Sequence, residues 1–285
     1  MNPFRKSLAL VVVSCLLHVL LAVSPAEALN LAVPVVNAET MWNAGYDGSG
    51  VAIGVIDLYQ ASATHPALAP SLLGSHSFAK GAGWFSAHAT AVAGAAVSAD
   101  ATYPGVAPGA GFWTVQTVKR SAITTIRDQT IALETFAQGL DFIQDADADS
   151  PEVITMSIGI GGTDDGDDQW SKALDHTVST NSRIITVAVG NSGPTTDTIF
   201  GIPPAAYNVI TVGATGSTID GNLSEDYSNV AYYSSRGLTD DNRSKPDIVA
   251  PGSLIHLPVL GGAWDGSERN QLCDAHGRRR RRPVG

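Results

Sequence analysis

The sequence predicts an α/β fold in which helices cover both faces of a central, mostly parallel sheet. Short apolar runs recur along the chain, and segments with apolar residues at helical spacing lie between them. The 29 glycines among 285 residues suit the tight turns that join strands to helices. Runs that are apolar throughout predict strands buried on both faces, as in a parallel sheet. The chain is long enough for one sizeable core.

The predicted elements follow one another with few long gaps. We expect strands at residues 51–56, 112–118, 153–158, 184–189 and 209–212. We expect helices at residues 37–44, 88–99, 130–146 and 169–180. The helix at 88–99 is rich in alanine, so it can lie very close to its neighbours.

The first 28 residues predict an export signal. Arg5 and Lys6 precede an apolar run over residues 7–23, and Ala26-Glu27-Ala28 fits the small-x-small cleavage rule. A membrane anchor is the alternative, although the run is short for crossing a bilayer. After cleavage Cys273 is the one cysteine left, which excludes an internal disulfide. We therefore expect a secreted protein, extracellular or periplasmic, without a stable membrane anchor.

The charge distribution bears on partners and metals. The formal net charge of −10 argues against nucleic acid as a partner. Oxygen-rich loops can bind calcium. Neither of the two acidic clusters matches a recognised calcium loop, so we interpret both as solvated loop charge and assign no metal. These clusters are Asp145, Asp147 and Asp149, and Asp164, Asp165, Asp167 and Asp168.

Three polar residues lie where reactive groups gather in α/β sheets. Asp57 ends the first strand, Asn191 follows the strand at 184–189, and His88 opens the alanine-rich helix. Acyl transfer needs a base held in one tautomer by a carboxylate, and a donor aimed at the developing oxyanion. Each residue alone also fits capping or turn chemistry. It is the combination that suggests catalysis.

These residues stand in segments that resemble the subtilase family, the subtilisin-like serine proteases. The strand ending at Asp57 resembles the family's aspartate strand, and HATAVAG at 88–94 resembles its H-G-T-x-V-A-G motif. Further similar segments, in the family's order, are GVAPGA at 105–110, VITMSIG at 153–159, VAVGNSG at 187–193, YSSRG at 233–237 and KPDIVAPG at 245–252. The resemblance runs from about residue 37 to Gly252.

The resemblance implies a fold and a domain plan. We expect a subtilisin-like three-layer sandwich that is incomplete at its C-terminus. Residues 1–28 form the signal peptide, residues 29–260 an incomplete catalytic domain, and residues 261–285 an aberrant basic tail. The implied activity is that of a secreted, monomeric serine endopeptidase that needs no cofactor and acts on protein or peptide substrates.

The resemblance also implies roles for single residues. Asp57 orients the imidazole, His88 is the general base and then the general acid, and Asn191 donates to the oxyanion. The pocket for the residue before the cut is bordered by Ser157, Ile158, Gly159, Ala188 and Gly190.

The sequence departs from the family pattern at three places. The usual D-T-G is Asp57-Leu58-Tyr59, and the glycine after the histidine is Ala89. The third departure follows Gly252, where the family's G-T-S-x-A-x-P, which carries the nucleophilic serine, is absent. Ser253 and Ser267 lack that motif, and no G-x-S-x-G elbow replaces it, so we expect neither to act as the nucleophile.

The replaced segment suggests a shift of reading frame. It leads into five arginines at 278–282, which are unusual in so acidic a chain. Synonymous codons for the residues from Ser267 onward can be chosen so that the frame one base later encodes ANGTSFATPMVAG. We therefore expect a one-base slip between about Gly252 and Arg269, which leaves the product as written inactive. A genuine basic tail that binds a polyanion is the alternative.

Two other functions remain open. A non-catalytic pseudoprotease that binds extended peptides would tolerate the lost serine. An unrelated secreted α/β binding domain would place Asp57 and His88 far apart, whereas the protease interpretation requires them within hydrogen-bond reach.

Overall fold

The computed structural model describes residues 28–78, 84–117, 133–145, 150–159, 164–195, 199, 203–218 and 220–265. The predictions for the signal peptide before Ala28, for Asp147 and Asp149, and for the tail with Ser267 and Cys273 lie outside these residues. None of the helices in the described ranges is long and apolar enough to cross a membrane.

A seven-stranded sheet forms the centre of the described structure, in the order β2-β3-β1-β4-β5-β6-β9, and every neighbouring pair is parallel. The strands are β1 (Ala52–Asp57), β2 (Leu72–Ser77), β3 (Gly111–Gln116), β4 (Val153–Met156), β5 (Ile184–Ala188), β6 (Ile210–Thr215) and β9 (Ile248–Pro251). The predicted fold class, a mostly parallel sheet with helices, is confirmed.

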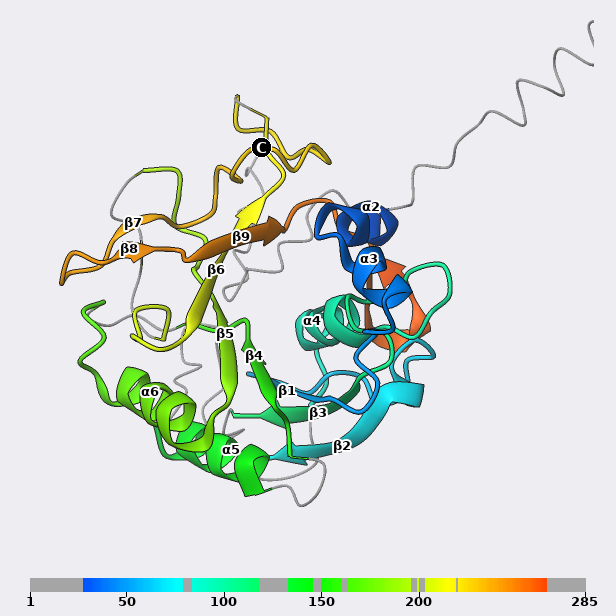
Figure 1. Cartoon of the computed structure of the whole chain (residues 1–285), viewed down its shortest axis with the longest axis horizontal. Coiled ribbons are helices and arrows are strands. Elements are labelled where there is room, and N and C mark those ends of the chain that lie inside the picture. Colours follow the sequence, from blue (N-terminus) through cyan, green and yellow to red (C-terminus); the bar gives the residue numbers. More distant parts are fainter. Residues whose placement is uncertain are drawn as a thin grey trace, which may run out of the picture.

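Helices lie on both faces of this sheet (Figure 1). The longer ones are α4 (Ala87–Val97) on one face, and α5 (Leu133–Asp145) and α6 (Gln169–Asn181) on the other. Two short helices, α2 (Ala28–Val35) and α3 (Ala38–Asn43), precede β1. Two small antiparallel pairs complete the structure: β7 (Gly237–Leu238) with β8 (Ser244–Lys245), and β10 (Leu257–Pro258) with β11 (Trp264–Asp265).

The side chains of β1 alternate between the two layers of the core. Ile53 and Val55 pack on the α4 side, whereas Ile56 packs on the α5 and α6 side. Gly54 points the same way as Ile56, because a Cβ there would lie 2.5 Å from Ile143 Cδ1 of α5. By the same alternation Asp57, the last residue of β1, faces the α4 side.

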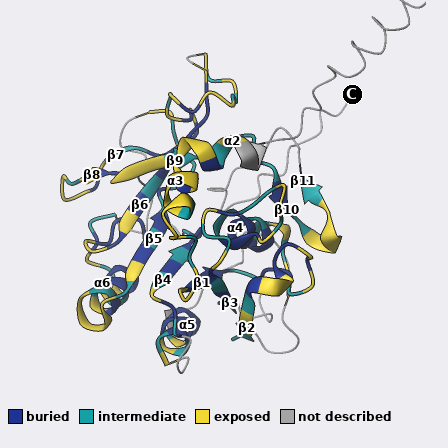
Figure 2. Cartoon of the chain, turned by 45° about the vertical axis from the view of Figure 1, so that its right-hand side comes forward, coloured by how far each residue is buried: buried dark blue, intermediate teal, exposed yellow. Residues whose placement is uncertain are grey.

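Helix α4 is deeply buried on its face of the sheet (Figure 2). Ala89 and Ala93 are completely buried. A Cβ at Gly94 would lie 2.1 Å from Pro258 Cγ, so only glycine lets β10 approach the helix this closely. The small residues of this segment therefore allow the close packing that the sequence predicted.

The strand order places a topological switch point beside β1. Strands β2 and β3 lie on one side of β1, and β4, β5, β6 and β9 lie on the other. In open parallel sheets, reactive groups occupy the crevice at the carboxyl ends of the strands at such a point. Asp57 ends β1 and Ser157 directly follows β4, so both residues stand at this end of the sheet.

The β10–β11 pair should give the fold a pH-dependent stability. His256 stacks on Trp264 and contacts the ring of Tyr103. Burial lowers the pKa of His256 below its ordinary value of 6.5, although Asp265 opposes the shift. The unfolded chain then binds the proton more readily, so stability is lost as the pH falls below about 6.5. Urea unfolding at pH 7.5 and 5.5 measures the free energy of unfolding at each pH. Its decrease from pH 7.5 to 5.5 should be smaller in His256→Phe than in the unmodified chain. An equal loss in both proteins would contradict this account.

Candidate active site

The site centres on a buried carboxylate and the imidazole beside it. Asp57 Oδ2 lies 2.8 Å from His88 Nδ1, and Asp57 is 2% exposed. The other carboxylate oxygen, Oδ1, accepts the backbone N–H groups of Leu58 at 2.6 Å and Tyr59 at 3.4 Å. An ionised carboxylate only accepts hydrogen bonds, so Nδ1 carries the proton and Nε2 is the accepting nitrogen. This arrangement fixes one tautomer of the imidazole.

His88 stands on a firmly anchored first turn of α4. Ser86 is the N-cap, and its hydroxyl accepts the backbone N–H of Ala89 at 3.0 Å. The backbone of Ser86 donates to Gln60 O at 3.0 Å, and Gln60 N donates to Trp84 O at 2.7 Å. These bonds tie the start of the helix to the segment after Asp57. The spacing between the carboxylate and the imidazole is therefore held by the backbone as well as by the side chains.

Substitutions at the N-cap, Ser86, measure how much this anchoring contributes to stability. We expect Ser86→Ala to lower the free energy of unfolding by about 1 kcal/mol, because one backbone donor of the first turn loses its acceptor. Ser86→Asp retains an acceptor and should stay close to the unmodified chain. Chemical denaturation of the three proteins makes the comparison, and equal stabilities for the alanine and aspartate variants would contradict the role of the cap.

The second imidazole nitrogen has a serine hydroxyl beside it. Ser157 Oγ lies 3.4 Å from His88 Nε2, and Ser157 is buried. The sequence marked Ser157 for substrate binding and missed this contact. The contact follows from the register of the structure: Ile56 pairs with Met156, so the next residues, Asp57 and Ser157, project on the same face of the sheet.

The predicted oxyanion residue, Asn191, follows β5 at the same carboxyl edge. Gly190 has a φ of 99°, a conformation that favours glycine, and its carbonyl accepts Ser235 N at 3.0 Å. Ser192 N donates to Ser235 Oγ at 2.9 Å. Bonds on both sides thus fix the backbone around Asn191, which is partly buried.

Two of the other predicted pocket residues, Ile158 and Gly159, follow β4, and Ala188 ends β5. Ile158 is 3% exposed and belongs to the core on the α5 and α6 side, so its side chain is not an exposed pocket wall. Gly159 directly follows it and is partly buried. Ala188 packs against the cluster formed by Ala214, Ala231 and Tyr233.

The departures from the family pattern are accommodated locally. Ala89 is completely buried within α4, and Leu58 packs against the core on the α5 and α6 side. Tyr59 stacks on Trp84, with 6.4 Å between ring centroids. Ser253 is also completely buried, and its Oγ lies 2.9 Å from the hydroxyl of Tyr233.

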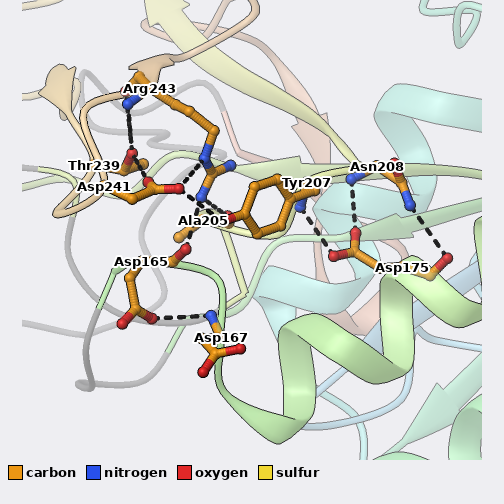
Figure 3. Close-up of polar contacts among 9 residues, drawn as sticks. All are labelled: Asp165, Asp167, Asp175, Ala205, Tyr207, Asn208, Thr239, Asp241 and Arg243. Atoms are coloured by element: carbon orange, nitrogen blue, oxygen red, sulfur yellow. Dashed lines mark hydrogen bonds and ion pairs between the residues drawn. The ribbon is translucent and has the colours of Figure 1, made fainter.

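The carboxylates after residue 163 serve the local structure. Asp168 caps α6 by accepting Trp170 N and Ser171 N, Asp167 pairs with Lys172, and Asp165 accepts Asp167 N. Figure 3 shows Asp165 in the neighbouring network, where its carbonyl accepts the guanidinium of Arg243.

The same network joins the turn between β7 and β8 to the segment that precedes β6. Arg243 also pairs with Asp241, which accepts the hydroxyls of Tyr207 and Thr239 (Figure 3). Within the described ranges, no group of three His, Cys, Asp or Glu side chains could hold a metal ion.

Comparison with known proteins shows what the chain resembles. The sequence model of the Subtilase family matches residues 48–282. The chain is 32% identical over 173 residues to serine protease AprX of Bacillus subtilis, covering 58% of this chain and 36% of AprX. It is 32% identical over 196 residues to pyrolysin of Pyrococcus furiosus, covering 61% of this chain and 13% of pyrolysin. It is 28% identical over 258 residues to subtilisin DY of Bacillus licheniformis, covering 88% of this chain and 82% of that protein.

Proposed function

The chain belongs to the subtilase family, and we propose that it descends from a secreted serine endopeptidase that hydrolyses peptide bonds in protein substrates. The observation that supports this most is the 2.8 Å contact between Asp57 and His88 at the switch point of the sheet. The chain spans about a third of AprX and about an eighth of pyrolysin, so neither relative's whole activity carries over.

In this proposal the site residues have distinct chemical roles. Asp57 holds His88 in the tautomer whose Nε2 accepts the proton of the nucleophile and later gives it to the leaving amine. Asn191 donates to the oxyanion of the tetrahedral intermediate. The backbone next to Ser157 and Gly190 borders the pocket for the residue before the cut. No cofactor takes part in these steps.

The 285-residue chain lacks the motif that carries the nucleophilic serine in the subtilase family. The residues after Gly252 contain no G-T-S-x-A-x-P, and the frame one base later is compatible with it. We propose that a one-base slip removed the serine and left the product as written without peptidase activity. Sequencing the locus tests the slip, and an unbroken frame through Arg282 would eliminate it.

Activity is tested on the chain read in the restored frame, which should hydrolyse labelled casein. The proposal fails if that protein folds and does not cleave. Secretion is supported by the basic start and the apolar run of residues 7–23. It is tested by expressing the full chain in a bacterial host and sequencing the N-terminus of the exported protein, which should begin after Ala28.

A non-catalytic peptide-binding role is the second candidate, and the absent serine motif favours it. An extended peptide could add as a strand beside residues 157–159, which follow β4. Fluorescence anisotropy with labelled casein peptides tests this on the chain as written. Saturable binding without cleavage supports the role, and absence of binding rejects it.

A further inference from the structure

We propose that Ser157 is a reactive nucleophile in this chain, and that His88 activates it toward electrophiles with a good leaving group. The inference rests on the proposed function in one respect, because it uses the Asp57–His88 pair as a general base. It goes beyond that function in assigning a second hydroxyl, which the sequence marked only for substrate binding.

The geometry supplies a complete carboxylate–imidazole–hydroxyl series. Asp57 Oδ2 lies 2.8 Å from His88 Nδ1, and His88 Nε2 lies 3.4 Å from Ser157 Oγ. With the proton on Nδ1, Nε2 is the accepting nitrogen and the hydroxyl is the donor. A nucleophile with a base beside it, and a third group orienting that base, is the arrangement that activates a serine. Such contacts are often longer before a substrate binds.

The position of Ser157 in the fold keeps this series together. Ser157 directly follows β4 and lies beside Asp57 of β1, on the face of the sheet that α4 covers. Two adjacent strands and the first turn of a capped helix therefore hold the three side chains. All three side chains precede Gly252 in the sequence, so a frame slip after Gly252 leaves them in the chain.

Another buried serine provides a matched comparison. Ser253 Oγ lies 2.9 Å from the hydroxyl of Tyr233, and Tyr227 donates its hydroxyl to Ser253 O at 3.1 Å. Its surroundings are phenolic, and neutral phenols are poor bases. We therefore expect Ser157 to react and Ser253 to remain unmodified.

The reaction with a fluorophosphonate is balanced without any further reactant. Ser157 Oγ forms a bond to phosphorus as the phosphorus–fluorine bond breaks, and its proton passes to His88 Nε2. Fluoride leaves with the bonding electron pair, and the imidazolium releases the proton to solvent. Fluoride departs without being protonated first, whereas an amide needs protonation of its leaving nitrogen and a well-placed oxyanion donor. Reactivity toward fluorophosphonates is therefore compatible with the absence of peptidase activity.

The test treats the 285-residue chain with a fluorophosphonate probe and maps the modified peptide by mass spectrometry. We expect the label on Ser157, its loss in Ser157→Ala, and no change in Ser253→Ala. His88→Ala should slow labelling by at least about 10²-fold, because general-base assistance is removed. A label on another residue, an unchanged rate in His88→Ala, or no label at all would overturn the proposal.

A second variant guards against loss of folding in the alanine protein. Ser157→Cys keeps a polar group of similar size, and its reaction with iodoacetamide should slow at least about 10-fold when His88→Ala is added. Equal rates with and without His88 would contradict the assignment. The outcome is separable from the proposed function. If Ser157 is not labelled in the chain as written while the restored-frame chain cleaves casein, this inference alone is rejected. If Ser157 is labelled while the restored-frame chain does not cleave casein, only the peptidase proposal is rejected.

Discussion

The chain read in the restored frame is expected to hydrolyse labelled casein, whereas the chain as written is expected to release no measurable peptide. Removing the serine from an intact triad of this type lowers kcat by about 10⁶-fold, because residual catalysis then rests on binding and the oxyanion donor. Asp57 and His88 lie within hydrogen-bond distance of each other, so under the proposed function the restored frame has only the family's nucleophilic serine to supply. Initial rates on the two proteins at equal concentration measure the difference.

Two controls make this comparison specific. His88→Ala in the restored-frame chain should lower the rate by several orders of magnitude, because the general base is lost. Ser179→Ala in the same chain should leave the rate within about twofold, since Ser179 lies on α6, where its hydroxyl donates to Asp175 O at 2.7 Å. Casein cleavage by the chain as written, at the rate of the restored chain, would contradict the proposed loss of the nucleophile.

Truncating Phe136 should have the largest effect on stability. Phe136 is completely buried and packs against Trp170 of α6, with 4.3 Å between ring centroids. We expect Phe136→Ala to lower the free energy of unfolding by about 3–5 kcal/mol, because it removes apolar contacts and leaves a cavity between the sheet and its helices. Urea unfolding followed by circular dichroism measures the loss.

Phe85→Ala is the matched control for this substitution. Phe85 is 48% exposed, so the same truncation removes little buried surface and should cost less than about 1 kcal/mol. Similar losses for the two variants would show that α5 and α6 do not cover the sheet as described.

The central strands could be predicted from the sequence because they are apolar throughout. Residues 51–56 carry Ile53, Val55 and Ile56, which fill both layers of the core, and the predicted strand matches β1 within a residue at each end. The outer strands could not be predicted in this way. Strand β2 is polar at Ser75, His76 and Ser77, because an edge strand is buried less completely.

The site was predicted in part, by the resemblance and not by periodicity. Asp57 and His88 are 31 residues apart in the sequence, and their places at a strand end and a helix start, together with the motifs around them, indicated that they meet. The contact of Ser157 with His88 depends on the register of β4 against β1, which no local pattern encodes. Ile158, which the resemblance placed at the border of the pocket, is buried in the core on the α5 and α6 side, because side chains alternate between the two faces along β4 and the residues that follow it.

The tautomer of His88 tests the central claim most directly. In the chain labelled with ¹⁵N at histidine, nuclear magnetic resonance of the neutral imidazole should show the one-bond proton coupling on Nδ1, where Asp57 accepts the hydrogen bond, and an unprotonated Nε2. Asp57→Asn should weaken that preference. A proton on Nε2 in the unmodified chain, with Nδ1 unprotonated, would contradict the account.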